Sequence, residues 1–289
     1  MYRDRLMSGL SEKIKKFKRG YIQLISAVLY NCHFTGFLSG RIYKGEAKRI
    51  CAPGLNCYSC PGAVLSCPLG SFQNSLSSSA YRFPLYILGT LLLSGILFGR
   101  AICSFLCPFG FFQELIHKIP TPKIKKSRVT RFFSYLKYVI LLLLVVLVPL
   151  WIHEPGFCKY ICPAGTLEAG IPLVIMNDMI RGKVGALFFI KVAVLVVTMV
   201  LCIFCYRAFC RFICPLGAIY GFFNPVSFWG IKTDKDKCTD CGVCVRKCEM
   251  DIKCAGDGEC ISCGDCVKSC PAGAISSTNS RLNYIQTLE

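Results

Sequence analysis

Apolar residues along this chain gather into long runs that polar, basic stretches separate. The runs cover Tyr21–Gly40, Phe83–Gly99, Tyr135–Ile152 and Gly185–Cys205, and the first of them is the least apolar. About 20 apolar residues in a helix cross a hydrocarbon core roughly 30 Å thick. We therefore expect about four transmembrane helices. A fifth apolar piece, Ala169–Met176, is too short to span and is expected to re-enter the membrane or to lie at its interface.

The predicted spans divide the chain into two halves with the same pattern. Each half has a span, an outer segment with cysteines, a second span and then an inner Cys-x-x-x-Cys-Pro-x-Gly motif. The inner motifs begin at Cys103 and at Cys210. Because both halves have the same orientation, the repeat is parallel. The fold class that we predict for residues 21–229 is therefore an all-α membrane bundle with a pseudo-two-fold repeat.

The charge distribution predicts the orientation of this bundle. The 289 residues carry a net charge of +18, and 54% of them are hydrophobic; the mean hydropathy is +0.51. Lysine and arginine are concentrated before the first span, between the second and third, and after the fourth, and such basic segments stay in the cytoplasm. We expect a multi-pass protein in the lipid of the cytoplasmic (inner) membrane, without a cleaved signal peptide. Its basic N-terminus, residues 1–20, and its C-terminus are expected to be cytoplasmic. The charges flank apolar runs instead of forming one basic face, so we expect no nucleic-acid partner.

The chain has 22 cysteines, and two dense runs of them follow the last span. Both runs have the Cys-x₂-Cys-x₂-Cys-x₃-Cys spacing of bacterial ferredoxins, in which the fourth cysteine of each run ligates the other cluster. We expect one four-iron cluster on Cys238, Cys241, Cys244 and Cys270, and a second on Cys260, Cys263, Cys266 and Cys248. The spacing predicts an α+β two-cluster ferredoxin domain at residues 232–280, followed by a tail at residues 281–289. Zinc and disulfides fit this spacing less well.

The cysteines of the membrane part are paired across the repeat. A four-iron cluster takes four thiolates, and one Cys-x-x-x-Cys motif supplies only two. We expect an inner cluster on Cys103, Cys107, Cys210 and Cys214. We expect an outer cluster on Cys158, Cys162, Cys67 and either Cys57 or Cys60, because Ala63 stands where the strict repeat needs a cysteine. The alternatives are zinc and reduced thiols that pack as small hydrophobic residues.

Some residues with possible chemistry lie outside these patterns. His33 falls within the first predicted span, where a histidine is a functional candidate for a hydrogen bond to a quinone; the alternative is a contact with a neighbouring helix. Extra cysteines stand at Cys32, Cys51, Cys202, Cys205 and Cys254.

The phrases "GRAICSFLCPFG" and "YRAFCRFICPLGAIYGFFNP", together with the two tail runs, resemble the NapH/NosR-type membrane iron–sulfur proteins. The resemblance extends from about residue 20 to residue 276. It implies a polyferredoxin-like subunit tied to quinol oxidation or to electron delivery to metalloenzymes. It also implies partner subunits of a redox complex, and donors and acceptors that differ between members.

The function that we predict is electron transfer, because no nucleophile–base set or phosphate loop is found in the sequence and the chemistry then belongs to the cofactors. Electrons pass between a soluble ferredoxin or other redox protein, the ferredoxin clusters and the membrane clusters, to or from a quinone, a partner subunit or an extracytoplasmic acceptor. The chain is then a subunit of an oxidoreductase complex. Two other functions stay open: a metal-centre assembly or metal-reducing accessory protein, and an iron–sulfur redox sensor.

Overall fold

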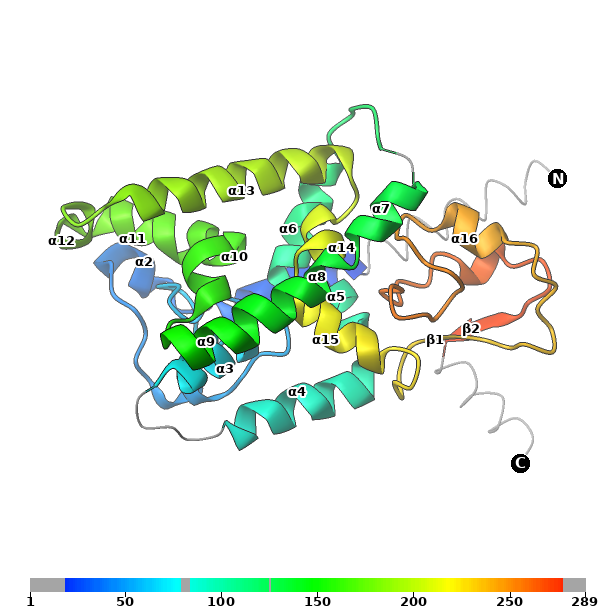
Figure 1. The fold of residues 1–289 in the computed structure, drawn as a ribbon, viewed down its shortest axis with the longest axis horizontal. Coiled ribbons are helices and arrows are strands. Elements are labelled where there is room, and N and C mark those ends of the chain that lie inside the picture. Colours follow the sequence, from blue (N-terminus) through cyan, green and yellow to red (C-terminus); the bar gives the residue numbers. More distant parts are fainter. Residues whose placement is uncertain (1–18, 79–83, 125, 278–289) are drawn as a thin grey trace.

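The computed structural model describes residues 19–78, 84–124 and 126–277. The described part is mainly helical and elongated, and Figure 1 shows a small unit with the two strands at one end of its long axis. The helices α4 and α13 and the run from α7 to α9 lie roughly along this axis (Figure 1). Short helices, among them α2, α11 and α12, lie at the opposite end.

Two helical runs in the described residues are long and apolar enough to cross a membrane. One is α13 (Ala186–Phe204), with a mean hydropathy of 2.9. The other is Arg128–Ile152, with a mean hydropathy of 2.4. This second run consists of α7 (Arg128–Phe133), α8 (Leu136–Ile140), the π-helical η2 (Leu141–Leu147) and α9 (Val148–Ile152). The π-helical turns end just before Pro149, which lacks an N–H and disturbs the α-helical hydrogen bonds around it.

The other two predicted spans are shorter than expected. The helix α4 (Leu85–Phe98) has 14 residues, or about 21 Å at 1.5 Å per residue. The predicted span Tyr21–Gly40 is not one helix: helical backbone over residues 19–30 is followed by a break and then by α2 (Thr35–Ser39). The four-span topology therefore stays a proposal.

A proline follows the last cysteine of each membrane motif and starts a helix in every case. Proline suits this first position because the N–H it lacks has no partner within a helix. The helices that begin in this way are α3 (Pro68–Ser77), α6 (Pro108–His117), α10 (Pro163–Gly165) and α15 (Pro215–Phe223). The first cysteine of each inner motif lies in a short helix, α5 (Ala101–Phe105) or α14 (Ala208–Phe212). At the motif of Cys158 and Cys162, η3 (Phe157–Ile161) precedes α10, which continues as η4 (Thr166–Gly170) and α11 (Ile171–Met176).

The ferredoxin-like unit is closed by a two-stranded antiparallel sheet. Strand β1 (Ile231–Thr233) pairs with β2 (Ile275–Ser277), so the first and last parts of the unit lie side by side. Strand β1 begins one residue before the predicted boundary of the domain, and its Ile231 is buried in the core of the unit. The remaining described helices are η1 (Glu46–Arg49), α12 (Asp178–Arg181), α16 (Val243–Lys247) and η5 (Val267–Ser269).

Candidate metal centres

Two cavities in the ferredoxin-like unit are each lined by four of the predicted ligands. A cavity of about 130 Å³ is lined by Cys238, Cys241, Cys244 and Cys270. A second cavity, of about 180 Å³, is lined by Cys248, Cys260, Cys263 and Cys266. Each combines three cysteines of one run with the last cysteine of the other. Four thiols around one cavity are the donor set of a four-iron cluster, so the residues present fit that group. Ligation itself stays a prediction.

The second of these cavities is the one nearer to the membrane part. Tyr206, which follows α13, lines it together with Asp265. The first cavity is lined instead by residues of the ferredoxin-like unit alone, among them Thr233, Ile275 and the extra cysteine Cys254.

The outer cysteines surround a small cavity between the two halves. Cys57 and Cys67 from the first half and Cys158 and Cys162 from the second half line it. Cys60 is absent from this lining and packs instead in a separate buried cluster with Ala63 and Ala169. The geometry therefore favours Cys57 over Cys60, a choice that the sequence left open.

The four inner cysteines are buried in one hydrophobic core that extends across both halves. These cysteines are Cys103, Cys107, Cys210 and Cys214. Each has an exposed fraction of 6% or less. Cys107 and Cys214 each lie near both Cys103 and Cys210. Across residues 19–277, apart from the gaps given above, no group of three or more His, Cys, Asp or Glu side chains is placed to hold a single metal ion.

Backbone N–H groups at the helix starts point at cysteine sulfur atoms. In three of the proline-started helices, the backbone nitrogen of a glycine lies 3.4 Å from Sγ of the cysteine three residues before it. The donor–acceptor pairs are Gly110–Cys107, Gly165–Cys162 and Gly217–Cys214. The first glycine is also needed for packing, because a Cβ at Gly110 would lie 2.9 Å from the carbonyl oxygen of Cys103.

Two buried arginines, which the sequence reasoning missed, cross between the halves at the inner site. Arg100 donates to the carbonyl oxygen of Cys210 at 3.3 Å, and Arg207 donates to that of Cys103 at 2.5 Å. Both residues are fully buried. Each arginine stands three residues before the first cysteine of its own motif. Both halves therefore contain the sequence Arg-Ala-x-Cys, and this repetition could have marked the two arginines as candidates.

Each of these guanidinium groups is paired with a glutamate. Arg100 lies 2.8 Å from Glu259 of the ferredoxin-like unit, and the fully buried Lys137 of α8 also bonds to this carboxylate. Burial by itself raises the pKa of the Glu259 carboxyl, but Arg100 and Lys137 oppose it and hold the pKa below its ordinary value. These contacts fix the ferredoxin-like unit against the membrane part.

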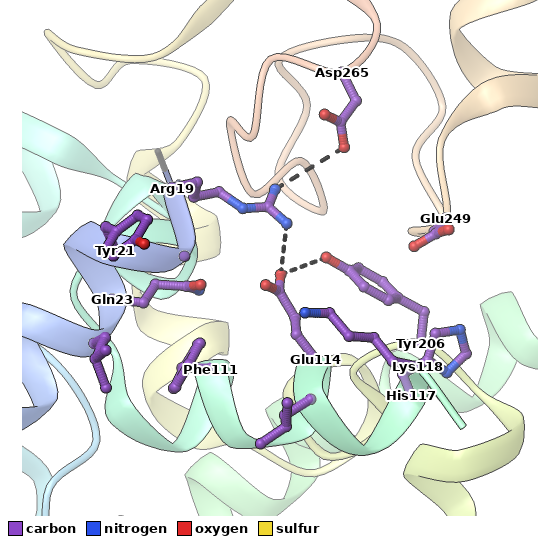
Figure 2. Close-up of a pocket in the computed structure, with 13 residues that line it drawn as sticks. Arg19, Tyr21, Gln23, Phe111, Glu114, His117, Lys118, Tyr206, Glu249 and Asp265 are labelled. Atoms are coloured by element: carbon purple, nitrogen blue, oxygen red, sulfur yellow. Dashed lines mark hydrogen bonds and ion pairs between the residues drawn. The ribbon is translucent and has the colours of Figure 1, made fainter. Parts of the chain in front are cut away.

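A second ion-pair network surrounds Glu114 of α6. Its carboxylate accepts from Arg19, from Tyr206 and from Arg207, and Figure 2 shows the first two of these contacts at a pocket between α6 and the ferredoxin-like unit. Arg19 also lies 3.9 Å from Asp265 of that unit. Burial alone raises the pKa of Glu114, but the neighbouring Arg207 and Arg19 lower it overall.

His33 lies in the break after the helical segment 19–30, not inside a continuous span. Its Nδ1 is 3.1 Å from the carbonyl oxygen of Pro61, and its Nε2 is 3.0 Å from the hydroxyl of Thr35. The ring lines an open cavity together with Tyr43 and Leu173. A quinone contact at His33 stays a prediction.

The extra cysteines of the membrane part lie in different surroundings. Cys202 and Cys205 are buried beside α14, and Arg211 donates to Cys205 Sγ at 3.3 Å. Cys51 packs against the large core without lining the outer cavity, and Cys32 is exposed.

Comparisons with known proteins match iron–sulfur families to parts of the chain. A family described as "4Fe-4S binding domain" matches residues 79–127, 137–186 and 184–232, which together make up half of the chain. A second "4Fe-4S binding domain" family matches residues 257–276. No solved structure matches the chain.

Several curated proteins are similar to parts of the chain. An uncharacterized protein of Methanocaldococcus jannaschii is 32% identical over 165 residues, which are 55% of this chain and 62% of the relative. The putative electron transport protein YccM of Escherichia coli is 27% identical over 60% of this chain and 48% of its own length. The regulatory protein NosR of Stutzerimonas stutzeri is 30% identical over 54% of this chain and 21% of its own length. The chain thus covers less than two thirds of each of these relatives.

The family matches and the similarity to NosR and YccM agree with the resemblance that the cysteine motifs indicated. The chain belongs to the 4Fe-4S binding domain family, as a membrane iron–sulfur protein of the NosR/NapH type.

Proposed function

We propose that this protein is a membrane electron-transfer subunit that holds four four-iron clusters in a line. The observation that carries the proposal is the order of the four cysteine sets along the molecule. The outer set lies around α3 and α10, the inner set around α6 and α15, and both ferredoxin sets lie beyond them at the end with the strands (Figure 1). Clusters bound at these cysteines supply one-electron carriers.

The chain's own residues hold and connect these sites. The proline-started helices bring cysteines of both halves together and direct glycine N–H groups at their sulfur atoms. The hydrophobic core around the inner set excludes water. The ion pair of Glu259 with Arg100 and the contact of Arg19 with Asp265 keep the second ferredoxin set next to the inner set.

We propose that the ferredoxin end faces the cytoplasm, where a soluble ferredoxin or another redox protein exchanges electrons with it. The acceptor or donor at the other end is a quinone, a partner subunit or an extracytoplasmic protein. This orientation follows from the basic residues that flank the apolar helices. The similarity to a putative electron transport protein supports the role in electron transfer.

Anaerobic purification with iron and sulfide analysis tests the proposal. Four clusters predict about 16 irons and about 16 sulfides per chain, and reduction is expected to produce EPR signals of reduced four-iron clusters. A protein that is folded and contains zinc in place of iron contradicts the proposal.

The outer site gives a matched test of its fourth ligand. Replacing Cys57 with Ser is expected to remove about four irons per chain, because Cys57 lines the outer cavity. Replacing Cys60 with Ser is expected to leave the iron content unchanged, because this cysteine packs against Ala63 and Ala169. Iron analysis of the two purified variants distinguishes them, and the reverse result would assign the site to Cys60.

A further inference from the structure

Two glutamines occupy equivalent positions beside the inner and the outer cysteine sets. Gln73 of α3 is the sixth residue after Cys67, and Gln113 of α6 is the sixth residue after Cys107. Their side chains lie inside the molecule, with exposed fractions of 0% and 1%. Neither residue is among the predicted ligands.

Each glutamine reaches across the repeat to a sulfur atom of the other half. Nε2 of Gln113 lies 3.1 Å from Sγ of Cys210, and Nε2 of Gln73 lies 3.4 Å from Sγ of Cys158. In both cases the sulfur belongs to the first cysteine of the partner motif. The same contact is thus made twice in one chain, once at each membrane site.

A hydrogen bond from the backbone fixes which end of the Gln73 side-chain amide faces the sulfur of Cys158. Oε1 of Gln73 accepts from the backbone N–H of Phe157 at 3.0 Å. A backbone N–H can only donate, so the oxygen must face Phe157. The NH₂ group is then left to face Cys158.

The orientation of the Gln113 side-chain amide is fixed by a hydrogen-bond acceptor instead. Nε2 of Gln113 lies 3.3 Å from the carbonyl oxygen of Phe109, which can only accept. The NH₂ group therefore has one hydrogen for this carbonyl and one for Cys210. On the other side of the amide, Oε1 lies 3.5 Å from the thiol of Cys202.

We propose that Gln73 and Gln113 are positioning residues that each donate an N–H to a cluster-bound sulfur, and that they raise the midpoint potentials of the outer and the inner site, respectively. This rests on the proposed function, because it requires iron at both sites. Reduction adds negative charge to a cluster, so a donor to its sulfur stabilises the reduced form more than the oxidised form.

Redox-titrated EPR of the full-length protein tests the proposal. The signals of the two membrane sites are first assigned by their loss in the Cys162→Ser and Cys214→Ser variants, which also tests whether iron is bound there. Midpoint potentials are then measured for Gln73→Met and Gln113→Met, which keep the length of the side chain and remove the donor. Gln73→Glu and Gln113→Glu are measured in parallel, because they keep the acceptor oxygen.

Tyr220→Phe is the control at the same register. Tyr220 is the sixth residue after Cys214, but its hydroxyl donates to the carbonyl oxygen of Pro53 at 2.8 Å and to no cysteine sulfur among the contacts of the described chain. Its replacement is expected to leave both membrane potentials unchanged.

With full iron content, Gln113→Met is expected to lower only the inner potential and Gln73→Met only the outer one. The expected change is about tenfold in the one-electron equilibrium, which corresponds to 59 mV. Unchanged potentials, equal shifts at both sites, or loss of iron from the Met and Glu variants alike would overturn the proposal. If Cys162→Ser and Cys214→Ser lose no iron, the proposed function itself fails, whatever the glutamine variants do.

Discussion

Replacing Glu259 with Gln is expected to release the ferredoxin-like unit from the membrane part. The change leaves the guanidinium of Arg100 and the ammonium of Lys137 without their shared carboxylate, and both are fully buried. Removing one partner of a buried ion pair costs about 3–5 kcal/mol, because an uncompensated charge stays buried. Limited proteolysis of the purified protein measures the release as faster cleavage between the membrane part and the unit.

Glu249→Gln is the matched control for this experiment. Glu249 lies on the same unit but is exposed, so its replacement is expected to leave the rate of cleavage unchanged. Equal cleavage rates for the Glu259 variant and this control would show that the ion pairs do not hold the unit in place.

The Cys107→Ser and Cys214→Ser variants are each expected to lose about four irons per chain. The two cysteines come from different halves but lie in one buried core, near the same two cysteines, Cys103 and Cys210. The double variant is expected to lose no more iron than either single one, because ligands of one site do not contribute additively. Iron analysis of the three purified proteins measures this.

Cys32→Ser provides the control, because Cys32 is exposed and its loss is expected to cost no iron. A double variant that loses twice the iron of each single variant would place Cys107 and Cys214 at separate sites. The buried Cys202 and Cys205 would then be the candidates to complete the site next to α13.

The grouping of the cysteines could be predicted because it depends on spacing and on symmetry alone. The crossed positions of Cys248 and Cys270 follow from the ferredoxin spacing, and each cysteine lines a cavity with three cysteines of the other run. Their ligation stays a prediction. The choice between Cys57 and Cys60 could not be predicted, because both lie in one irregular loop and only the packing of that loop separates them.

The contacts between the halves could not be predicted from the sequence, for a different reason. Arg100 and Gln113 contact Cys210, which lies about a hundred positions away along the chain. No local sequence pattern predicts which distant residue a side chain will contact. The first predicted span is not one continuous helix, and apolar content over Tyr21–Gly40 does not reveal the break near His33. Hydropathy predicts burial in lipid, but it carries no information on contacts such as the one between His33 and the carbonyl oxygen of Pro61.

The pairing of cysteines from distant parts of the chain has a consequence for biosynthesis. A proposed site can accept iron only after its last cysteine has left the ribosome. The outer set is completed by Cys162 and the inner set by Cys214, followed by Cys266 and then Cys270 for the two ferredoxin sets. Translation thus makes the sites available in order from the outer end to the far ferredoxin end, and a nascent chain that stops before Cys158 contains none of them complete.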